Sequence, residues 1–299
     1  WNNHFSGRDA PAQTAFMNEK LLSHRLLGLA GQEQSAKSFS AISKYSIPYY
    51  EIDTRVSKDG EIFVHHDPWL VNNDGKRYRI SNLNGVEIRA YAEENNSDIV
   101  DLKTALGLFS ANANPGVTLC VDIKDYGFEK RHCDLISQNG LIDRVSIVSW
   151  IPQTVLKMSK VCRSNPLILS CLLTRKYPLF TSRVSNALQN KMIRFGDYII
   201  LGNSVLDPLQ AKYHKGYQYS LFSHVLDPSI INILADSGGG ICVPTWLCCD
   251  ALYQYCSDNS LELWIFTVNN SEEYDIFKNL DQVSVIFSDN AINLCESNI

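Results

Sequence analysis

The 299-residue sequence lacks the features that mark membrane, fibrous or disordered proteins. No apolar run reaches the roughly 18 residues that cross a bilayer, so no transmembrane segment is expected. No internal repeat or low-complexity tract occurs, and 45% apolar and 20% charged residues are ordinary globular values. Positive charge is scarce, because 27 Lys and Arg residues face 32 Asp and Glu residues. The resulting net charge of −5 argues against a nucleic-acid partner.

Nine cysteines are present, but they form no pattern typical of a metal site. Their number is odd, and Cys248 and Cys249 are adjacent instead of forming a C-x-x-C motif. Cys120 and Cys171 lie inside apolar runs, where a thiol behaves as a small hydrophobic group. We therefore expect a reduced chain in the cytoplasm, with a removed leader as the open alternative.

Short apolar runs alternate with helical patterns along most of the chain. Strands are expected at Lys20–His24, Tyr49–Arg55, Glu61–His65, Val117–Ile123, Val145–Ser149, Leu167–Leu172, Tyr198–Leu201, Gly240–Pro244, Leu261–Val268 and Val283–Phe287. Helices are expected at Gln32–Tyr45, Ile99–Ser110, Pro152–Val161, Pro228–Ala235, Cys248–Ser257 and Ser271–Asn279. Such alternation predicts an α/β fold with a parallel sheet, and about eight units favour a (β/α)8 TIM barrel.

Two stretches interrupt this rhythm. Residues 68–97 are polar and contain the turn signal Asn72–Gly75, and residues 176–223 are longer than one crossover needs. We interpret both as insertions on one face of the barrel, the first being a small insertion after the second β-unit. Because no linker is visible, residues 1–299 are predicted to form one domain.

Ionisable residues gather at the ends of expected strands. Glu51 and Asp53 are two apart on a strand, so their carboxylates point to the same face. Two such acids are either solvated at a strand edge or, if buried, need a cation or a proton between them, of which a divalent cation is the more economical solution. Asp122, on the next barrel strand, offers a third oxygen ligand and favours a divalent cation, Mg²⁺ or Ca²⁺.

Two histidines and two cationic residues accompany these acids. His24 and His66 could act as general acid and base, whereas His65 alternates to the opposite face from His66. Arg25 and Lys124 could bind an anion such as phosphate. Each of these residues alone has a structural explanation, as a core histidine or a surface ion pair.

The combination is more specific than its parts. In order, the chain contains His24-Arg25, Glu51-x-Asp53, Lys58-Asp59-Gly60, His66-Asp67, Asp122-x-Lys124, Ser149-Trp150, Phe266-Thr267-Val268-Asn269 and Ser288-Asp289. This series resembles the glycerophosphodiester phosphodiesterase family, with its H-R-G, E-x-D, K-D-G, H-D, E-x-K, S-F, W-T-V-N and T-D motifs. The resemblance runs from about residue 20 to about residue 292.

The departures from the family pattern indicate a divergent member. Leu26 stands in place of the H-R-G glycine, and Gln32–Ser35 replace a P-E-N-T segment. Asp122 replaces a glutamate, Phe266 replaces a tryptophan, and Asn290-Ala291 replace Arg-Pro. None of these changes removes a charged role outright.

The resemblance implies metal-dependent cleavage of a small-molecule, lipid or polymer phosphodiester. Glu51, Asp53 and Asp122 would hold Mg²⁺ or Ca²⁺, and Arg25 and Lys124 would bind the phosphoryl oxygens. His24 and His66 would transfer protons, in an order that the sequence leaves open, through a cyclic phosphate.

Three alternatives stay open at this point. Trp246 is a candidate wall of the substrate pocket, although core packing would also explain it. A phospholipase-like enzyme that cleaves a lipid phosphodiester is the first rival function. A non-catalytic binder of phosphorylated ligands is the second, although two titrating imidazoles are not needed for binding alone. The sequence does not define the oligomeric state.

Overall fold

The computed structural model describes residues 19–149, 151–161, 168–172, 228–245, 248 and 250–296. Nine strands of this part form one sheet, in the order β1-β11-β10-β9-β8-β7-β6-β2-β3. The strands are β1 (Leu21–Ser23), β2 (Tyr49–Val56), β3 (Ile62–Val64), β6 (Thr118–Ile123), β7 (Val145–Ser149), β8 (Ile168–Leu172), β9 (Gly240–Pro244), β10 (Glu262–Phe266) and β11 (Val285–Ser288).

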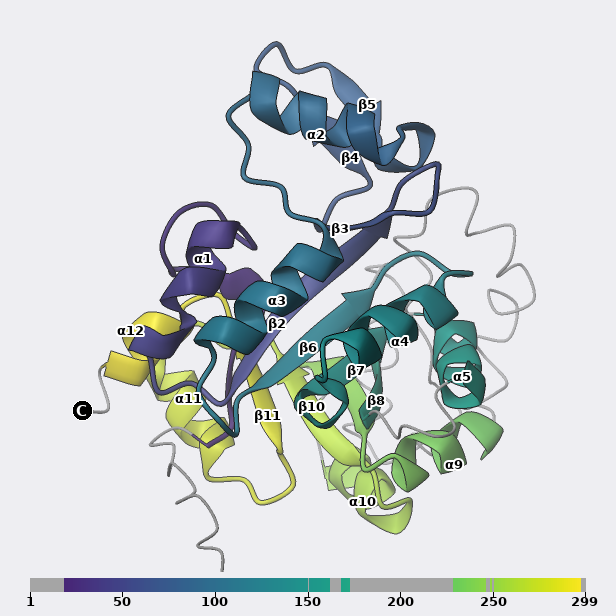
Figure 1. Ribbon diagram of the computed structural model, residues 1–299. Coiled ribbons are helices and arrows are strands. Elements are labelled where there is room, and N and C mark those ends of the chain that lie inside the picture. The colour runs from purple at the N-terminus through teal and green to yellow at the C-terminus, as the bar shows by residue number, and fades with distance from the viewer. Residues whose placement is uncertain are drawn as a thin grey trace, which may run out of the picture.

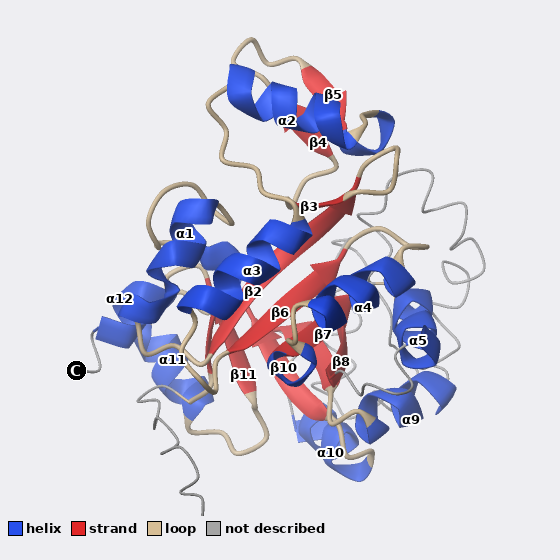
Figure 2. Ribbon diagram, viewed as in Figure 1, coloured by secondary structure: helices blue, strands red, loops and turns tan. Residues whose placement is uncertain are grey.

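The sheet is parallel and curled, and only β3 of these nine strands runs antiparallel to its neighbour, β2. β1 is hydrogen-bonded to β11 on one side and to β2 on the other. Helices lie on the outside of the curled sheet (Figures 1 and 2). They are α1 (Ala36–Ala41), α3 (Leu102–Asn112), α4 (Glu129–Gln138), α5 (Pro152–Val161), α9 (Pro228–Asp236), α10 (Asp250–Asp258), α11 (Ser271–Lys278) and α12 (Ala291–Glu296). The predicted α/β class with a parallel sheet is therefore confirmed.

Alternation along the strands separates two apolar layers. One layer joins the sheet to the helices, and Leu21, Ile52 and Val121 belong to it. The other is a separate cluster of Leu22, Cys120, Val148, Cys242, Trp264, Val285 and Phe287, which point to the opposite side of the sheet. Two residues beyond Leu22, Cys120 and Phe287 come His24, Asp122 and Asp289. The polar residues thus form the next layer above the inner apolar cluster, toward the carboxyl ends of the strands.

Residues 69–94 form a small module, which we call the hairpin module. It contains the antiparallel strands β4 (Trp69–Val71) and β5 (Arg77–Arg79), the 3-10 turn η3 (Ile80–Asn82) and the helix α2 (Gly85–Glu94). The predicted turn at Asn72–Gly75 joins the two strands, and Gly75 has a positive φ of 77°. Phe63, Leu70, Ile80 and Ile88 form an apolar cluster that ties the module to β3. Figure 1 shows the module beyond the carboxyl ends of β2 and β6.

Some sequence-based expectations fall outside this description or need correction. The strand at Tyr198–Leu201 and the insertion at 176–223 lie outside the described residues. Cys133 is disulfide-bonded, so the expectation of a fully reduced chain is wrong at that position. Among the described residues, no helix is both long and apolar enough to cross a membrane.

Candidate active site

Three carboxylates meet at the carboxyl ends of two neighbouring strands. Glu51 and Asp53 lie on β2 and Asp122 lies on β6, where Asp53 and Asp122 are direct partners in the parallel register. One oxygen of each carboxylate lies within 4.8 Å of the others. All three residues are at most 2% exposed, so solvated acids at a strand edge are the wrong interpretation.

Two cationic side chains contact this cluster of acids. The Lys124 ammonium lies 2.8 Å from Asp53 Oδ1 and 2.5 Å from Asp122 Oδ2. Arg25 Nε lies 3.3 Å from Asp53 Oδ2, and the Arg25 backbone N–H donates to Glu51 Oε2 at 3.0 Å. Both residues that were predicted to bind an anion therefore lie at the acids.

The acids differ in their electrostatic environment. Burial, together with the charge of Asp53, raises the pKa of Glu51 to about 8. Burial opposes the charged form of Asp53 as well, but the charges of Lys124, His66 and Arg25 outweigh it and lower the pKa of Asp53. The cationic side chains therefore keep Asp53 charged, whereas the charged form of Glu51 is not compensated within the cluster.

His24 follows β1 and contacts the acids from a third strand. It donates from Nδ1 to Asp289 Oδ1 at 2.6 Å, and its Nε2 lies 3.8 Å from Glu51 Oε2. Asn269 in turn donates to Asp289 Oδ2 at 3.1 Å. Burial alone would lower the pKa of His24, but Asp289, Glu51 and Asp53 raise it. Asp289 therefore orients His24 and favours its protonated form.

His66 approaches the acids from the β2–β3 side. It donates from Nδ1 to Asp67 Oδ1 at 2.8 Å. Burial lowers its pKa to about 4, although the charge of Asp53 acts in the opposite direction. His65 instead donates from Nε2 to the Trp69 carbonyl at 3.2 Å. The two site histidines thus have pKa values shifted in opposite directions, as in acid–base pairs.

Arg55 is a site-supporting residue that the sequence analysis missed. Its Nε donates to the His66 carbonyl at 2.9 Å, and its Nη1 donates to Asp125 at 3.1 Å. Asp125 also accepts the Val56 backbone N–H at 2.8 Å. Arg55 is two residues beyond Asp53, so the same alternation that placed Glu51 and Asp53 could have identified it.

Gln34 is a second residue that was missed, although its segment was noted as a departure from the family. Its side-chain amide donates to Asp53 Oδ2 at 3.0 Å and accepts the Asp53 backbone N–H at 2.6 Å. Gln34 adopts a left-handed φ of 55°, and Leu26, in the position of the family's glycine, adopts a φ of 53°. Left-handed backbone is thus kept here without glycine.

The donor set fits a divalent cation. Three converging buried carboxylates are unfavourable without positive charge, and carboxylate oxygen is the ligand type that Mg²⁺ and Ca²⁺ prefer. Trp246, the predicted pocket wall, lies outside the described residues.

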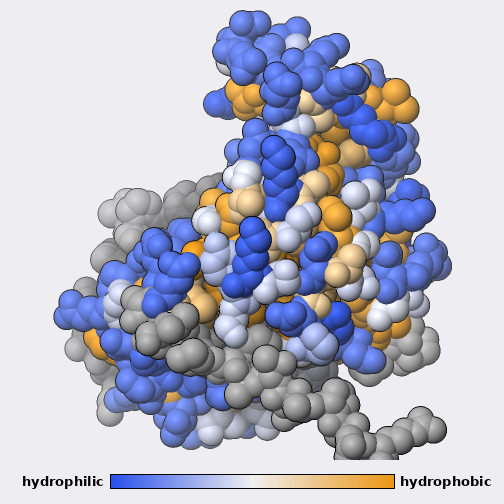
Figure 3. Space-filling view, turned by 60° about the vertical axis from the view of Figure 1, so that its left-hand side comes forward, coloured by the Kyte–Doolittle hydropathy of each residue, from blue (hydrophilic) through white to orange (hydrophobic). Residues whose placement is uncertain are grey.

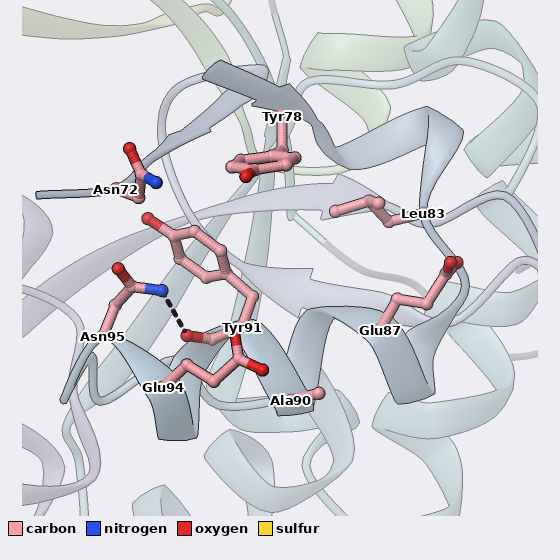
Figure 4. Close-up of a pocket in the computed structure, with 8 residues that line it drawn as sticks. All are labelled: Asn72, Tyr78, Leu83, Glu87, Ala90, Tyr91, Glu94 and Asn95. Carbon is pink, nitrogen blue, oxygen red and sulfur yellow. Dashed lines mark hydrogen bonds between the residues drawn. The ribbon is translucent and has the colours of Figure 1, made fainter. Parts of the chain in front are cut away.

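A cavity of about 390 Å³ lies elsewhere, in the hairpin module (Figure 4). Tyr78 on β5 and Tyr91 on α2 meet edge to face with ring centroids 5.8 Å apart, and both line it. Neither is among the residues that surround the acids, so this cavity is distinct from the acid cluster.

Fold and site together define a TIM-barrel-like α/β protein with a charged centre at the carboxyl ends of its strands. No family model matches the sequence, and no curated protein matches it significantly. Solved structures do match its fold. A glycerophosphodiester phosphodiesterase from Agrobacterium tumefaciens is 13% identical with a TM-score of 0.60, and covers 93% of this chain and 99% of its own.

Two further neighbours agree. A glycerophosphodiester phosphodiesterase from Thermotoga maritima is 14% identical with a TM-score of 0.58, and the match covers 93% of this chain and 97% of that one. A phosphodiesterase from Oleispira antarctica, solved with the product sn-glycerol-3-phosphate, is 15% identical with a TM-score of 0.58, covering 93% and 96%. The resemblance to glycerophosphodiester phosphodiesterases is therefore confirmed at the level of the fold.

Proposed function

We propose that this protein is a divergent glycerophosphodiester phosphodiesterase built on a complete (β/α)8 barrel with the hairpin module inserted after its second β-unit. It hydrolyses a glycerophosphodiester-type substrate to an alcohol and a phosphomonoester. One observation carries the proposal: Glu51, Asp53 and Asp122 converge within 4.8 Å on a fold shared with these enzymes. The neighbour with bound sn-glycerol-3-phosphate supports a small phosphomonoester as one product.

Glu51, Asp53 and Asp122 would hold Mg²⁺ or Ca²⁺. When bound, the cation neutralises charge on the phosphoryl oxygens. Arg25 and Lys124 already lie at the acids and bind the phosphate of the substrate. Arg25 and Lys124 both contact Asp53, so the same two cationic side chains would bind the substrate phosphate and this carboxylate.

His24 and His66 transfer the protons of the reaction. A hydroxyl next to the phosphate loses its proton to one imidazole, and its oxygen forms a new bond to phosphorus. The bond from phosphorus to the leaving alcohol breaks, and the other imidazole protonates that alcohol. Water then opens the cyclic phosphate. A neighbouring hydroxyl has the advantage of a high effective concentration, on the order of 10⁵ M or more.

Turnover of a generic aryl phosphodiester and of glycerophosphodiesters tests the proposal. Chelator-treated protein should be inactive, and Mg²⁺ or Ca²⁺ should restore hydrolysis. Full activity after chelation would contradict the metal assignment. Tight binding of a phosphodiester without any turnover would instead support the non-catalytic binder.

A substrate analogue tests the cyclic intermediate separately. Deleting or methylating the hydroxyl next to the phosphate should leave binding intact, because the phosphate contacts survive, yet abolish turnover. Normal turnover of that analogue would show direct attack by water.

Location and partners remain predictions. The cytoplasm is still the predicted location, but the disulfide at Cys133 removes part of its basis. The expected partner is a small-molecule, lipid or polymer phosphodiester, with no nucleic acid.

A further inference from the structure

The hairpin module carries an unusual outer face. In its antiparallel register, Trp69 pairs with Arg79 and Val71 pairs with Arg77, so these four side chains share one face. We call this the hairpin face. The side chains between them, Leu70 and Tyr78, point to the other face and pack in the module's apolar cluster.

The hairpin face is open to solvent. Trp69 is 37% exposed and Val71 is 51% exposed, although tryptophan and valine are both costly to expose to water. The Arg79 guanidinium lies 5.5 Å from the centroid of the Trp69 ring. Figure 3 shows hydrophobic residues on the surface of this module among hydrophilic ones.

The charge of the hairpin opposes that of the whole chain. Lys76, Arg77 and Arg79 are cationic, and Asp74 in the turn is the one acidic residue between 69 and 79. The complete chain has a net charge of −5. A local cationic face with exposed tryptophan on an anionic protein is complementary to a surface that is negatively charged and partly apolar.

The hairpin face is also close to the proposed active site along the chain. Trp69 follows His66 after two residues, and its carbonyl accepts a hydrogen bond from His65 at 3.2 Å. The module stands beyond the carboxyl ends of the strands that carry the acids (Figure 1). The module that carries the hairpin face therefore stands at the same end of the sheet as the acids.

We propose that the hairpin face docks onto an anionic lipid surface. Tryptophan rings settle at the level of lipid headgroups, arginines contact lipid phosphates, and an aliphatic side chain enters the acyl boundary. The docking itself does not depend on catalysis. Its consequence, that the substrates include headgroup phosphodiesters of lipids, rests on the proposed function. A stable protein partner is disfavoured, because two apolar side chains supply far less area than such an interface needs.

Co-sedimentation with vesicles tests the docking without using activity. The full chain is mixed with vesicles of phosphatidylcholine alone, or of phosphatidylcholine with 30% phosphatidylglycerol. We expect binding to the anionic vesicles, and weaker binding at high salt. The double variant Arg77→Gln/Arg79→Gln should bind roughly 25-fold more weakly, since each arginine near such a surface contributes about fivefold. Trp69→Ser/Val71→Ser should lose at least about tenfold.

Matched control variants distinguish an effect of the hairpin face from a general loss of exposed apolar side chains or of positive charge. Val86, on α2 of the same module, is 71% exposed, so Val86→Ser removes an exposed apolar side chain elsewhere. Lys44→Gln/Lys103→Gln removes two exposed cationic charges from the body of the protein. Both controls should bind like the unmodified chain. Failure to bind anionic vesicles, or equal weakening by the controls, would overturn the proposal.

Activity on two substrates then separates docking from function. Trp69→Ser/Val71→Ser should hydrolyse a short, water-soluble phosphodiester at the normal rate but lose activity on vesicle-bound lipid. Vesicle binding by a protein that hydrolyses nothing would keep the docking and reject the proposed function. Hydrolysis of the soluble substrate without vesicle binding would keep the proposed function and reject the docking.

Discussion

Two regions on opposite sides of β2 and β6 each combine buried carboxylate with a histidine, but the two regions pair these groups differently. At the strand ends, Glu51, Asp53 and Asp122 converge within 4.8 Å of one another. Near the start of α4, the fully buried Glu129 has its own cation, since Lys157 Nζ lies 2.9 Å from Oε2. Its Oε1 accepts the Gly127 backbone N–H at 2.9 Å.

The histidines differ in the same way. His132 is fully buried, donates from Nδ1 to the Phe128 carbonyl at 2.9 Å, and has Nε2 3.1 Å from the Thr54 hydroxyl. His24 and His66 are partly exposed beside several charges. One-to-one pairing of buried polar groups stabilises the fold, whereas converging like charges are the arrangement that we propose to bind a cation.

The largest expected difference between the regions is in activity. His24→Ala and His66→Ala should each lower the rate on the order of 10²–10⁴-fold, because each removes a proton-transfer group. His132→Gln should leave the rate per folded molecule close to normal. Steady-state kinetics on an aryl phosphodiester checks this. A loss for His132→Gln as large as that for His66→Ala would break the comparison.

Acid should destabilise the protein through His132. Burial lowers the pKa of His132 to about 4, so between about pH 6.5 and 4 the unfolded chain binds a proton that the folded chain does not. Stability should therefore fall as pH falls through this window, by up to about 3 kcal/mol. Urea unfolding at pH 7 and pH 5 measures it. His132→Gln should reduce this pH dependence, and an unchanged slope would contradict the assignment.

The two buried glutamates should affect stability in opposite directions. Burial and Asp53 raise the pKa of Glu51 to about 8, so without metal its contribution becomes less favourable as pH rises from about 4.5 to 8. At pH 7 in chelator, Glu51→Gln should stabilise by on the order of 2 kcal/mol. Glu129→Gln should destabilise by about 1–3 kcal/mol, because it weakens a buried charged pair. If both substitutions changed the free energy of unfolding in the same direction, this contrast would be refuted.

A smaller effect on activity is expected from replacing Asp289, which accepts a hydrogen bond from His24. Asp289→Asn removes the carboxylate that orients His24 and raises its pKa, so activity should fall about 10- to 100-fold. The pKa of His24 should decrease, which NMR titration of the imidazole can follow. Asp134→Asn is the matched control, since Asp134 pairs with Lys130 on the surface. An unchanged imidazole titration in Asp289→Asn would show that Asp289 does not set the state of His24.

The sequence predicted most barrel strands and brought the acids together correctly, because both depend on local periodicity. Glu51 and Asp53 follow the two-residue repeat of β2. The helix expected at Ile99–Ser110 is present as α3, which begins at Leu102 after Asp101 accepts the Thr104 N–H. The helices Gly85–Glu94 and Glu129–Gln138 were not predicted, because both sequences are polar. These helices pack against segments that are distant in the sequence, and the periodicity of apolar residues does not reveal such contacts.

Residues that act across the fold were also missed. The expected helix at Gln32–Tyr45 begins in the structure only at Ala36, after the Ser35 cap, because Gln34 adopts a left-handed conformation and binds Asp53. That contact joins residues 19 positions apart and has no local pattern. The opposite roles of Glu51 and Glu129 likewise depend on neighbours from other elements.

Divalent-ion binding tests the central claim, that the converging acids serve a cation, most directly. Calorimetric titration of chelator-treated protein with Mg²⁺ and with Ca²⁺ should show one saturable site per chain for at least one of the two ions. Glu51→Gln should abolish that site, and Glu129→Gln should keep it. Absence of saturable binding, or equal binding by Glu51→Gln and the unmodified protein, would contradict the account.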